Sequence, residues 1–134
     1  MLKHLKSLAL LIVLVAASAM IGSLSAQWLS SPSAEFIEGD YSTQRQATGT
    51  DVVLIGTAWC GYCKQTREFL AERGVNYADL DLENSEQAYQ WAQSLEAPGV
   101  PVLLIGDRQI RGFRPDQIDA ALAVWNKQRQ AERG

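Results

Sequence analysis

The 134-residue sequence has few of the side chains that bind structural metals or build disulfide frameworks: one histidine, His4, and two cysteines, Cys60 and Cys63. Zinc usually takes four ligands, and His4 is far from both cysteines in the chain, so a zinc site is disfavoured. A bridge between Cys60 and Cys63 would close a very short loop and constrain the unfolded chain little, which disfavours a purely structural disulfide. The Cys-x-x-Cys spacing instead indicates redox chemistry.

The chain also lacks an excess of positive charge, with 12 basic residues against 15 acidic ones. Removal of residues 1–26 would take away Lys3 and Lys6 and make the remainder more negative. A negatively charged domain is poorly suited to nucleic acid or to anionic lipid surfaces. We therefore expect no nucleic-acid partner, and membrane contact only through the N-terminal segment.

The first 26 residues have the pattern of an export signal. Lys3 and Lys6 precede the apolar and small residues of 8–24, and small residues at Ala19 and Ala26 offer cleavage positions. An uncleaved anchor is the alternative, because about 17 apolar residues can span a bilayer. Under either interpretation the positive end stays inside, so the rest of the chain is expected to be exported, either periplasmic or anchored to the membrane and facing outward.

Residues 27–50 are rich in Ser, Gln, Thr and Gly and show little periodicity. They are predicted to be a flexible linker, with a short strand or an extended arm at 35–38 as an open alternative. From Asp51 to the C-terminus the pattern becomes regular, so 51–134 is predicted to be the folded domain.

The central motif of that domain is Thr-Ala-Trp-Cys-Gly-Tyr-Cys-Lys at 57–64. It follows the apolar run 52–55 and begins a helical pattern that ends near Arg73. The first cysteine then stands at a helix N-terminus, where free N–H groups and the helix dipole favour an anion. Such sites lower the thiol pKa from about 8.5 by one to several units. We therefore expect Cys60 to attack disulfides as a thiolate, and Cys63, one turn further on, to resolve the product.

The rest of the domain alternates strands and helices. A strand at 75–82 is followed by a helix that Asn84 or Ser85 caps and that ends near Leu95. A buried strand at 102–105, a turn at 106–107, a strand at 109–111 and a helix beginning at Pro115 complete the chain. The order βαβαββα predicts an α/β domain with a four-stranded mixed sheet and helices on both faces.

Three motifs in this order resemble those of glutaredoxins, which have a thioredoxin-like fold: Trp-Cys-Gly-Tyr-Cys at 59–63, Gly-Val-Pro-Val at 99–102 and Gly-Phe at 112–113. The resemblance covers about 51–125. It implies that Cys60 and Cys63 form a redox-active disulfide and that Pro101 is a cis-proline facing the sulfurs. A cis bond there would free the backbone of Val100 to pair with an extended substrate.

The remaining candidate residues flank these motifs. Trp59 is expected to be a partly buried lid beside Cys60, and Tyr62 to cover the sulfurs or lie on the surface. Asp79 and Asp81 are expected at the surface, with a buried proton-transfer carboxylate as the alternative. We expect a substrate-binding role for Arg111, Gly112, Phe113 and Arg114. The two arginines would hold a carboxylate of glutathione or of an acidic partner. The alternative is that they are only solvated surface.

The sequence departs from glutathione-using glutaredoxins at Thr57, where a basic residue is usual, and at Val100, where Thr is usual. The stretch 112–116 is similar to NrdH-redoxins, which thioredoxin reductase reduces. The electron donor is therefore left open between glutathione and a reductase.

The resemblance implies a thiol–disulfide oxidoreductase that acts on protein or glutathione mixed disulfides. We expect a monomer with no bound cofactor. Two alternatives belong to other classes, namely a glutaredoxin that binds an iron–sulfur cluster and a non-catalytic, membrane-tethered module that binds peptides.

Overall fold

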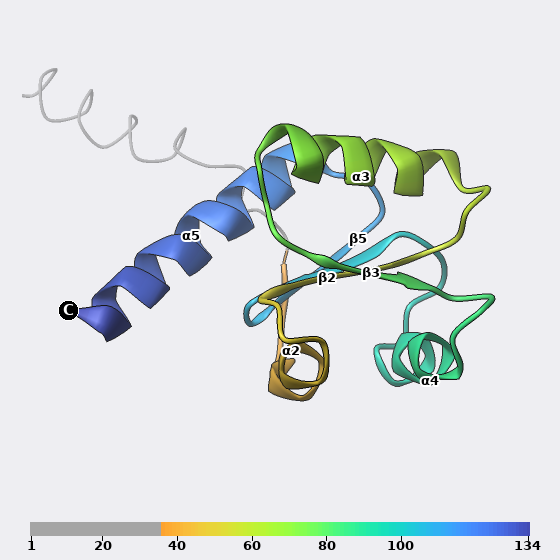
Figure 1. Ribbon diagram of the computed structural model, residues 1–134, viewed down its shortest axis with the longest axis horizontal. Helices are drawn as coiled ribbons and strands as arrows, with labels where there is room; N and C mark the ends of the chain where they lie inside the picture. The colour runs from red at the N-terminus through yellow and green to blue at the C-terminus, as the bar shows by residue number, and fades with distance from the viewer. Residues whose placement is uncertain (1–35) are drawn as a thin grey trace, which may run out of the picture. The chain divides into compact units, whose positions relative to one another are not determined.

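A five-stranded mixed sheet with helices on both faces makes up the computed structural model, which describes residues 36–134 (Figure 1). The α/β class with helices on both faces of a mixed sheet, predicted from the sequence, is confirmed. In chain order the elements are β1 (Ile37–Glu38), α2 (Ser42–Thr48), β2 (Val52–Gly56), α3 (Gly61–Glu72), β3 (Ala78–Asp81), α4 (Glu86–Ser94), β4 (Val102–Ile105), β5 (Arg108–Arg111) and α5 (Pro115–Arg133).

The strands lie in the order β1-β5-β4-β2-β3. Only β2 and β3 run parallel; the other neighbouring strands are antiparallel. Leu54 of β2 pairs with Asp79 on one side and with Leu103 on the other. Both central strands, β2 and β4, are buried along their whole length. Their sequences are continuously apolar because helices cover both faces of the sheet.

The predicted count of four strands is wrong, because β1 adds a fifth strand at the edge. Ile37 and Glu38 pair antiparallel with Gln109 and Arg108 of β5. Helix α2 follows, and the buried ring of Tyr41 packs into the core beneath it. The sequence predicted a flexible linker at 27–50. The part of it from β1 to the end of α2 belongs to the domain instead. A two-residue strand and a helix with one buried residue, Gln44, are too short to show a periodic pattern.

The predicted signal or anchor at 1–26, and the linker residues before 36, lie outside the described residues. None of the helices within 36–134 combines the length and apolar character needed to cross a bilayer.

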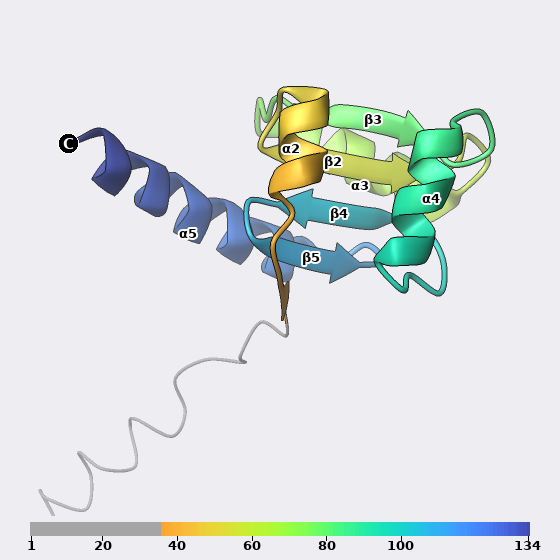
Figure 2. The same cartoon turned by 90° about the horizontal axis from the view of Figure 1, so that it is seen from below.

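Each face of the sheet has its own apolar core. Toward α3 and α5, Leu70 and Ile118 pack on Leu103 and Ile110. Toward α2 and α4, the buried residues that meet are Tyr41, Val53, Ile55, Ala88, Leu95, Val102 and Leu104. Figures 1 and 2 show α3 on one side of the sheet and α2 and α4 on the other. Because β2 lies in the centre of the sheet and α3 packs on it, the loop after β2 leads directly to the start of α3.

Most of the helix boundaries follow the sequence prediction. Gly74 has a positive φ of 62° and ends α3, while Val75 N–H donates to Leu70 O at 3.0 Å. Ser85 caps α4 by accepting the Ala88 N–H at 3.2 Å. Pro115 begins α5. The strand predicted at 75–82 is shorter than expected, since β3 covers only Ala78–Asp81.

Candidate active site

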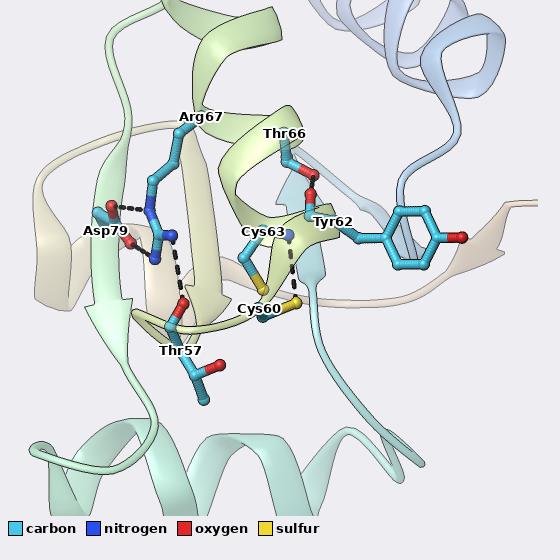
Figure 3. A network of polar contacts seen from close by, with 7 residues as sticks. All are labelled: Thr57, Cys60, Tyr62, Cys63, Thr66, Arg67 and Asp79. Carbon is cyan, nitrogen blue, oxygen red and sulfur yellow. Dashed lines mark hydrogen bonds and ion pairs between the residues drawn. The ribbon is translucent and has the colours of Figure 1, made fainter.

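The two cysteines lie at the start of α3, immediately after the loop that leaves β2. Cys60 is the N-cap residue, and its Sγ accepts the backbone N–H of Cys63 at 3.2 Å (Figure 3). Cys60 is 8% exposed and Cys63 is fully buried. The helix N-terminus therefore directs a backbone donor at the sulfur of Cys60, which favours negative charge there. Both sulfurs are free thiols.

Two distant loops meet this helix end. The Val100–Pro101 peptide is cis, as the resemblance implied, and the Cys60 thiol donates to Val100 O across 3.9 Å. Gly112 N–H donates to Pro101 O at 2.8 Å. The Cys-x-x-Cys motif, the proline loop and the turn after β5 are thus neighbours in space, although about forty to fifty residues separate them in sequence.

The environment of Cys63 disfavours its ionisation. Burial, followed by the hydrogen bond and the charge interaction with Cys60, raises the pKa of the Cys63 thiol from 9.0 to about 11. The Thr57 backbone and the Arg67 charge act in the opposite direction. Cys63 is therefore a neutral thiol near neutral pH.

An ion pair that the sequence analysis did not anticipate lies beside Cys63. Arg67 Nε and Nη2 donate to the two oxygens of Asp79 at 2.6 and 3.2 Å, and Nη1 donates to Thr57 O at 3.3 Å (Figure 3). Arg67 follows Cys63 by four residues, and residues four apart share a helix face, so this spacing could have identified it. Asp79 is exposed, as expected, and it is the partner of Arg67 in this ion pair.

Thr57, at the position where glutathione-using relatives usually carry a basic residue, is 2% exposed. Its hydroxyl has no hydrogen-bond partner within the described part of the chain. Its backbone carbonyl accepts the hydrogen bond from Arg67 Nη1.

The two aromatic residues of the motif are exposed. Trp59, predicted to be a partly buried lid, is 73% exposed, and its Nε1 donates to Glu83 Oε1 at 3.0 Å. The lid prediction is therefore wrong, because the hydrogen bond to Glu83 holds the indole at the surface. Tyr62 is 62% exposed, and Figure 3 shows its ring pointing away from the sulfurs.

The residues at the end of β5 and just after it lie partly in the core and partly at the surface. Phe113 packs edge-on against Phe69 at 5.6 Å between ring centroids. Arg111 Nη2 donates to Leu95 O at 2.8 Å, so one end of its guanidinium is occupied. Together with Arg114 it lines a cavity of about 170 Å³ whose other lining residues are Ile37, Gln109 and Gln117. Neither cysteine is among them, so the two arginines come together, but not around the sulfurs.

Comparison with known proteins agrees with this arrangement. Residues 52–110 match the family model described as glutaredoxin. The glutaredoxin-like 8.6 kDa protein of the rubredoxin operon in Clostridium pasteurianum is 29% identical over 69 residues, which are 51% of this chain and 92% of that protein. A glutaredoxin of Pseudomonas aeruginosa is 27% identical over 81 residues, covering 54% of this chain and 96% of its own.

Among solved structures, a glutaredoxin from Archaeoglobus fulgidus aligns with a TM-score of 0.50 at 22% identity. The alignment covers 62% of this chain and 94% of that structure. Fold and site together define a thioredoxin-fold redox protein with two cysteines close together. Within that class, the chain is similar to glutaredoxins over residues 52–110.

Proposed function

We propose that this protein is a thiol–disulfide oxidoreductase acting on protein or glutathione mixed disulfides through Cys60 and Cys63. The observation that carries the proposal is the position of Cys60, whose sulfur caps α3, accepts a backbone N–H and lies next to the Val100 carbonyl. Its partner thiol follows one turn later, fully buried, where no bulky disulfide can reach it.

The reaction has two exchange steps. The Cys60 thiolate attacks one sulfur of the substrate disulfide, forming a new S–S bond while the second substrate sulfur leaves as a thiolate. Cys63 then loses its proton and attacks Cys60 Sγ, which releases the first substrate sulfur as a thiolate. The substrate gains two electrons, and Cys60 and Cys63 end as a disulfide. Glutathione or a reductase would supply two electrons to regenerate the dithiol.

Substrate binding is assigned to the groups around Cys60. The backbone of Val100 would pair with an extended segment of the substrate, in the manner of an added strand. Trp59 and Tyr62, in the same motif as Cys60, present exposed aromatic rings to a partner. Gly112 supports the proline loop by donating its N–H to Pro101 O, and Phe113 packs on Phe69 of α3. Away from the sulfurs, Arg111 and Arg114 line a separate cavity that offers a cationic contact for a carboxylate.

The first experiment is turnover of a glutathione mixed-disulfide substrate by the reduced full-length chain. Cys60→Ser should abolish turnover, and Cys63→Ser should accumulate a mixed disulfide at Cys60 that mass spectrometry detects. Full activity of Cys60→Ser would exclude this function. A variant with both cysteines replaced that still binds peptide would favour the non-catalytic module.

The donor is assigned by running the assay with glutathione and glutathione reductase, and separately with thioredoxin reductase. Turnover with glutathione would make Arg111 and Arg114 the candidates for its carboxylates, and their replacement by Ala should then raise KM. Turnover only with thioredoxin reductase would exclude glutathione as the donor.

We also propose that the redox domain works outside the cytoplasm. The support is the order of Lys3 and Lys6 before the apolar segment 8–24. A reporter enzyme that is active only after export, fused behind residue 26, tests the proposal. Activity that persists after Ile12→Arg interrupts the apolar segment would contradict it.

A further inference from the structure

The guanidinium of Arg67 and the thiol of Cys63 lie on the same side of Gly56, the last residue of β2. A Cβ built on Gly56 would lie 3.0 Å from Cys63 Sγ and 3.4 Å from Arg67 Nη2. Because glycine has no side chain, nothing from β2 separates the positive charge from the sulfur. A positive charge next to a buried sulfur acts on the ionisation of that sulfur more strongly than it would in water.

Three acceptors hold that charge in place. Both Asp79 oxygens and the Thr57 carbonyl receive hydrogen bonds from Arg67, which leaves its side chain 26% exposed. A bidentate pair with a carboxylate fixes both the position and the plane of a guanidinium. The hydrogen bonds of Arg67 thus keep its charge next to Cys63 rather than in solvent.

Few charged groups face the thiol from the elements around it. Cys60 at the start of α3 and Arg67 one turn beyond Cys63 are the groups that act on it by charge. From the β3 side, Asp79 and Tyr77 act on Arg67. Arg67 is the positive group in this set, and it opposes the effects of burial and of Cys60.

We propose that Arg67, positioned by Asp79, stabilises the Cys63 thiolate that resolves the mixed disulfide. In that step Cys63 releases its proton to solvent, its sulfur forms a bond to Cys60 Sγ, the Cys60–substrate bond breaks and the substrate departs as a thiolate. This inference rests on the proposed function and names the positioning residue for its second step.

The direct test measures the ionisation of Cys63 without turnover, so its outcome is independent of the proposed function. In the full chain carrying Cys60→Ser, the ultraviolet absorbance of the thiolate is followed against pH. Arg67→Gln should raise the midpoint by about half a pH unit or more, because a positive neighbour favours the charged form. Arg67→Met removes the charge with a different shape and should raise it similarly, whereas Arg67→Lys keeps the charge and should recover at least half of the shift.

Arg73 provides the matched control. It lies just past the end of the same helix and pairs with both oxygens of Asp119 at 2.6 and 2.9 Å, but it is not among the groups that act on Cys63. Arg73→Gln should leave the midpoint unchanged. An unchanged midpoint in both neutral Arg67 variants, or an equal shift in Arg73→Gln, would overturn the proposal.

A kinetic measurement separates this role from general damage. With both cysteines present, Arg67→Gln should slow release of substrate from a preformed mixed disulfide by about threefold or more near neutral pH, and the deficit should shrink at high pH as Cys63 ionises. In a Cys63→Ser background the same substitution should leave the rate of mixed-disulfide formation by Cys60 within twofold. Equal slowing of both steps would contradict a specific action on Cys63.

Discussion

The indole ring of Trp125 fills the space that a side chain at Gly106 would need. A Cβ built on Gly106 would lie 2.1 Å from Trp125 Cε3 and 2.3 Å from Cδ2, and Gly106 has a φ of 60°. Gly106→Ala must therefore both displace the ring and place alanine in the left-handed region. We expect a loss of about 3 kcal/mol or more in the free energy of unfolding, measured by chemical denaturation.

Gly74→Ala is the control for the backbone term alone. Gly74 has a φ of 62°, but a Cβ there would meet nothing within 4 Å. Its replacement should cost about 1–2 kcal/mol. Equal losses in the two variants would mean that the contact of Trp125 with the turn contributes nothing to stability.

A second prediction concerns the segment before β2. The Tyr41 hydroxyl lies 3.2 Å from both Ile37 O and Gln109 Oε1 and joins β1 to β5. Tyr41→Phe leaves buried acceptors without this donor and should lower the free energy of unfolding by about 1–2 kcal/mol. Tyr62→Phe, at an exposed ring, should change it by less than about 0.5 kcal/mol. No loss in Tyr41→Phe would mean that β1 and α2 are not coupled to the domain.

The elements that sequence could predict are those with long patterns or strong end signals. The buried runs of β2 and β4, the Ser85 cap and Pro115 are all of this kind. β1 and α2 carry too few residues to show a periodic pattern. β1 pairs with β5, and Tyr41, just before α2, lies in a core cluster with residues distant in the chain.

The residues of the candidate site likewise fall into those that sequence motifs reveal and those that depend on distant partners. Cys60, Cys63 and Pro101 were found from motifs. Arg67 was not, since its role depends on Asp79 and on the missing side chain at Gly56, and those residues come from other elements. The exposure of Trp59 depends likewise on a bond to Glu83, 24 residues away.

A third prediction follows from the buried thiol. Folding raises the pKa of Cys63 from 9.0 to about 11, so the folded state holds this proton more tightly than the unfolded state does. The resulting stabilisation is complete below about pH 9 and is lost as the pH rises toward 11. Denaturant midpoints of the reduced protein should fall across that window, and the fall should be smaller in Cys63→Ser. An equal fall in the two proteins would assign it to other groups.

The last prediction concerns Trp59, whose indole is 73% exposed beside Cys60 and held by Glu83. A large aromatic ring fixed at the surface next to a reactive sulfur is suited to contact a partner protein. Trp59→Ala should lower kcat/KM for a folded protein disulfide by about three- to tenfold, mainly through KM, while a small glutathione disulfide should be much less affected. Glu83→Ala, which frees the ring without removing it, should have a smaller effect in the same direction.

Tyr89 is the matched control for this surface. It is also an exposed aromatic residue, at 49%, but it lies on α4 rather than in the Cys-x-x-Cys motif. Tyr89→Ala should leave kcat/KM for the protein disulfide within about twofold, because its ring is not carried by the loop that holds Cys60. If Trp59→Ala impaired the small and the large substrate equally, the indole would act on the chemistry of Cys60 and not on recognition of the partner.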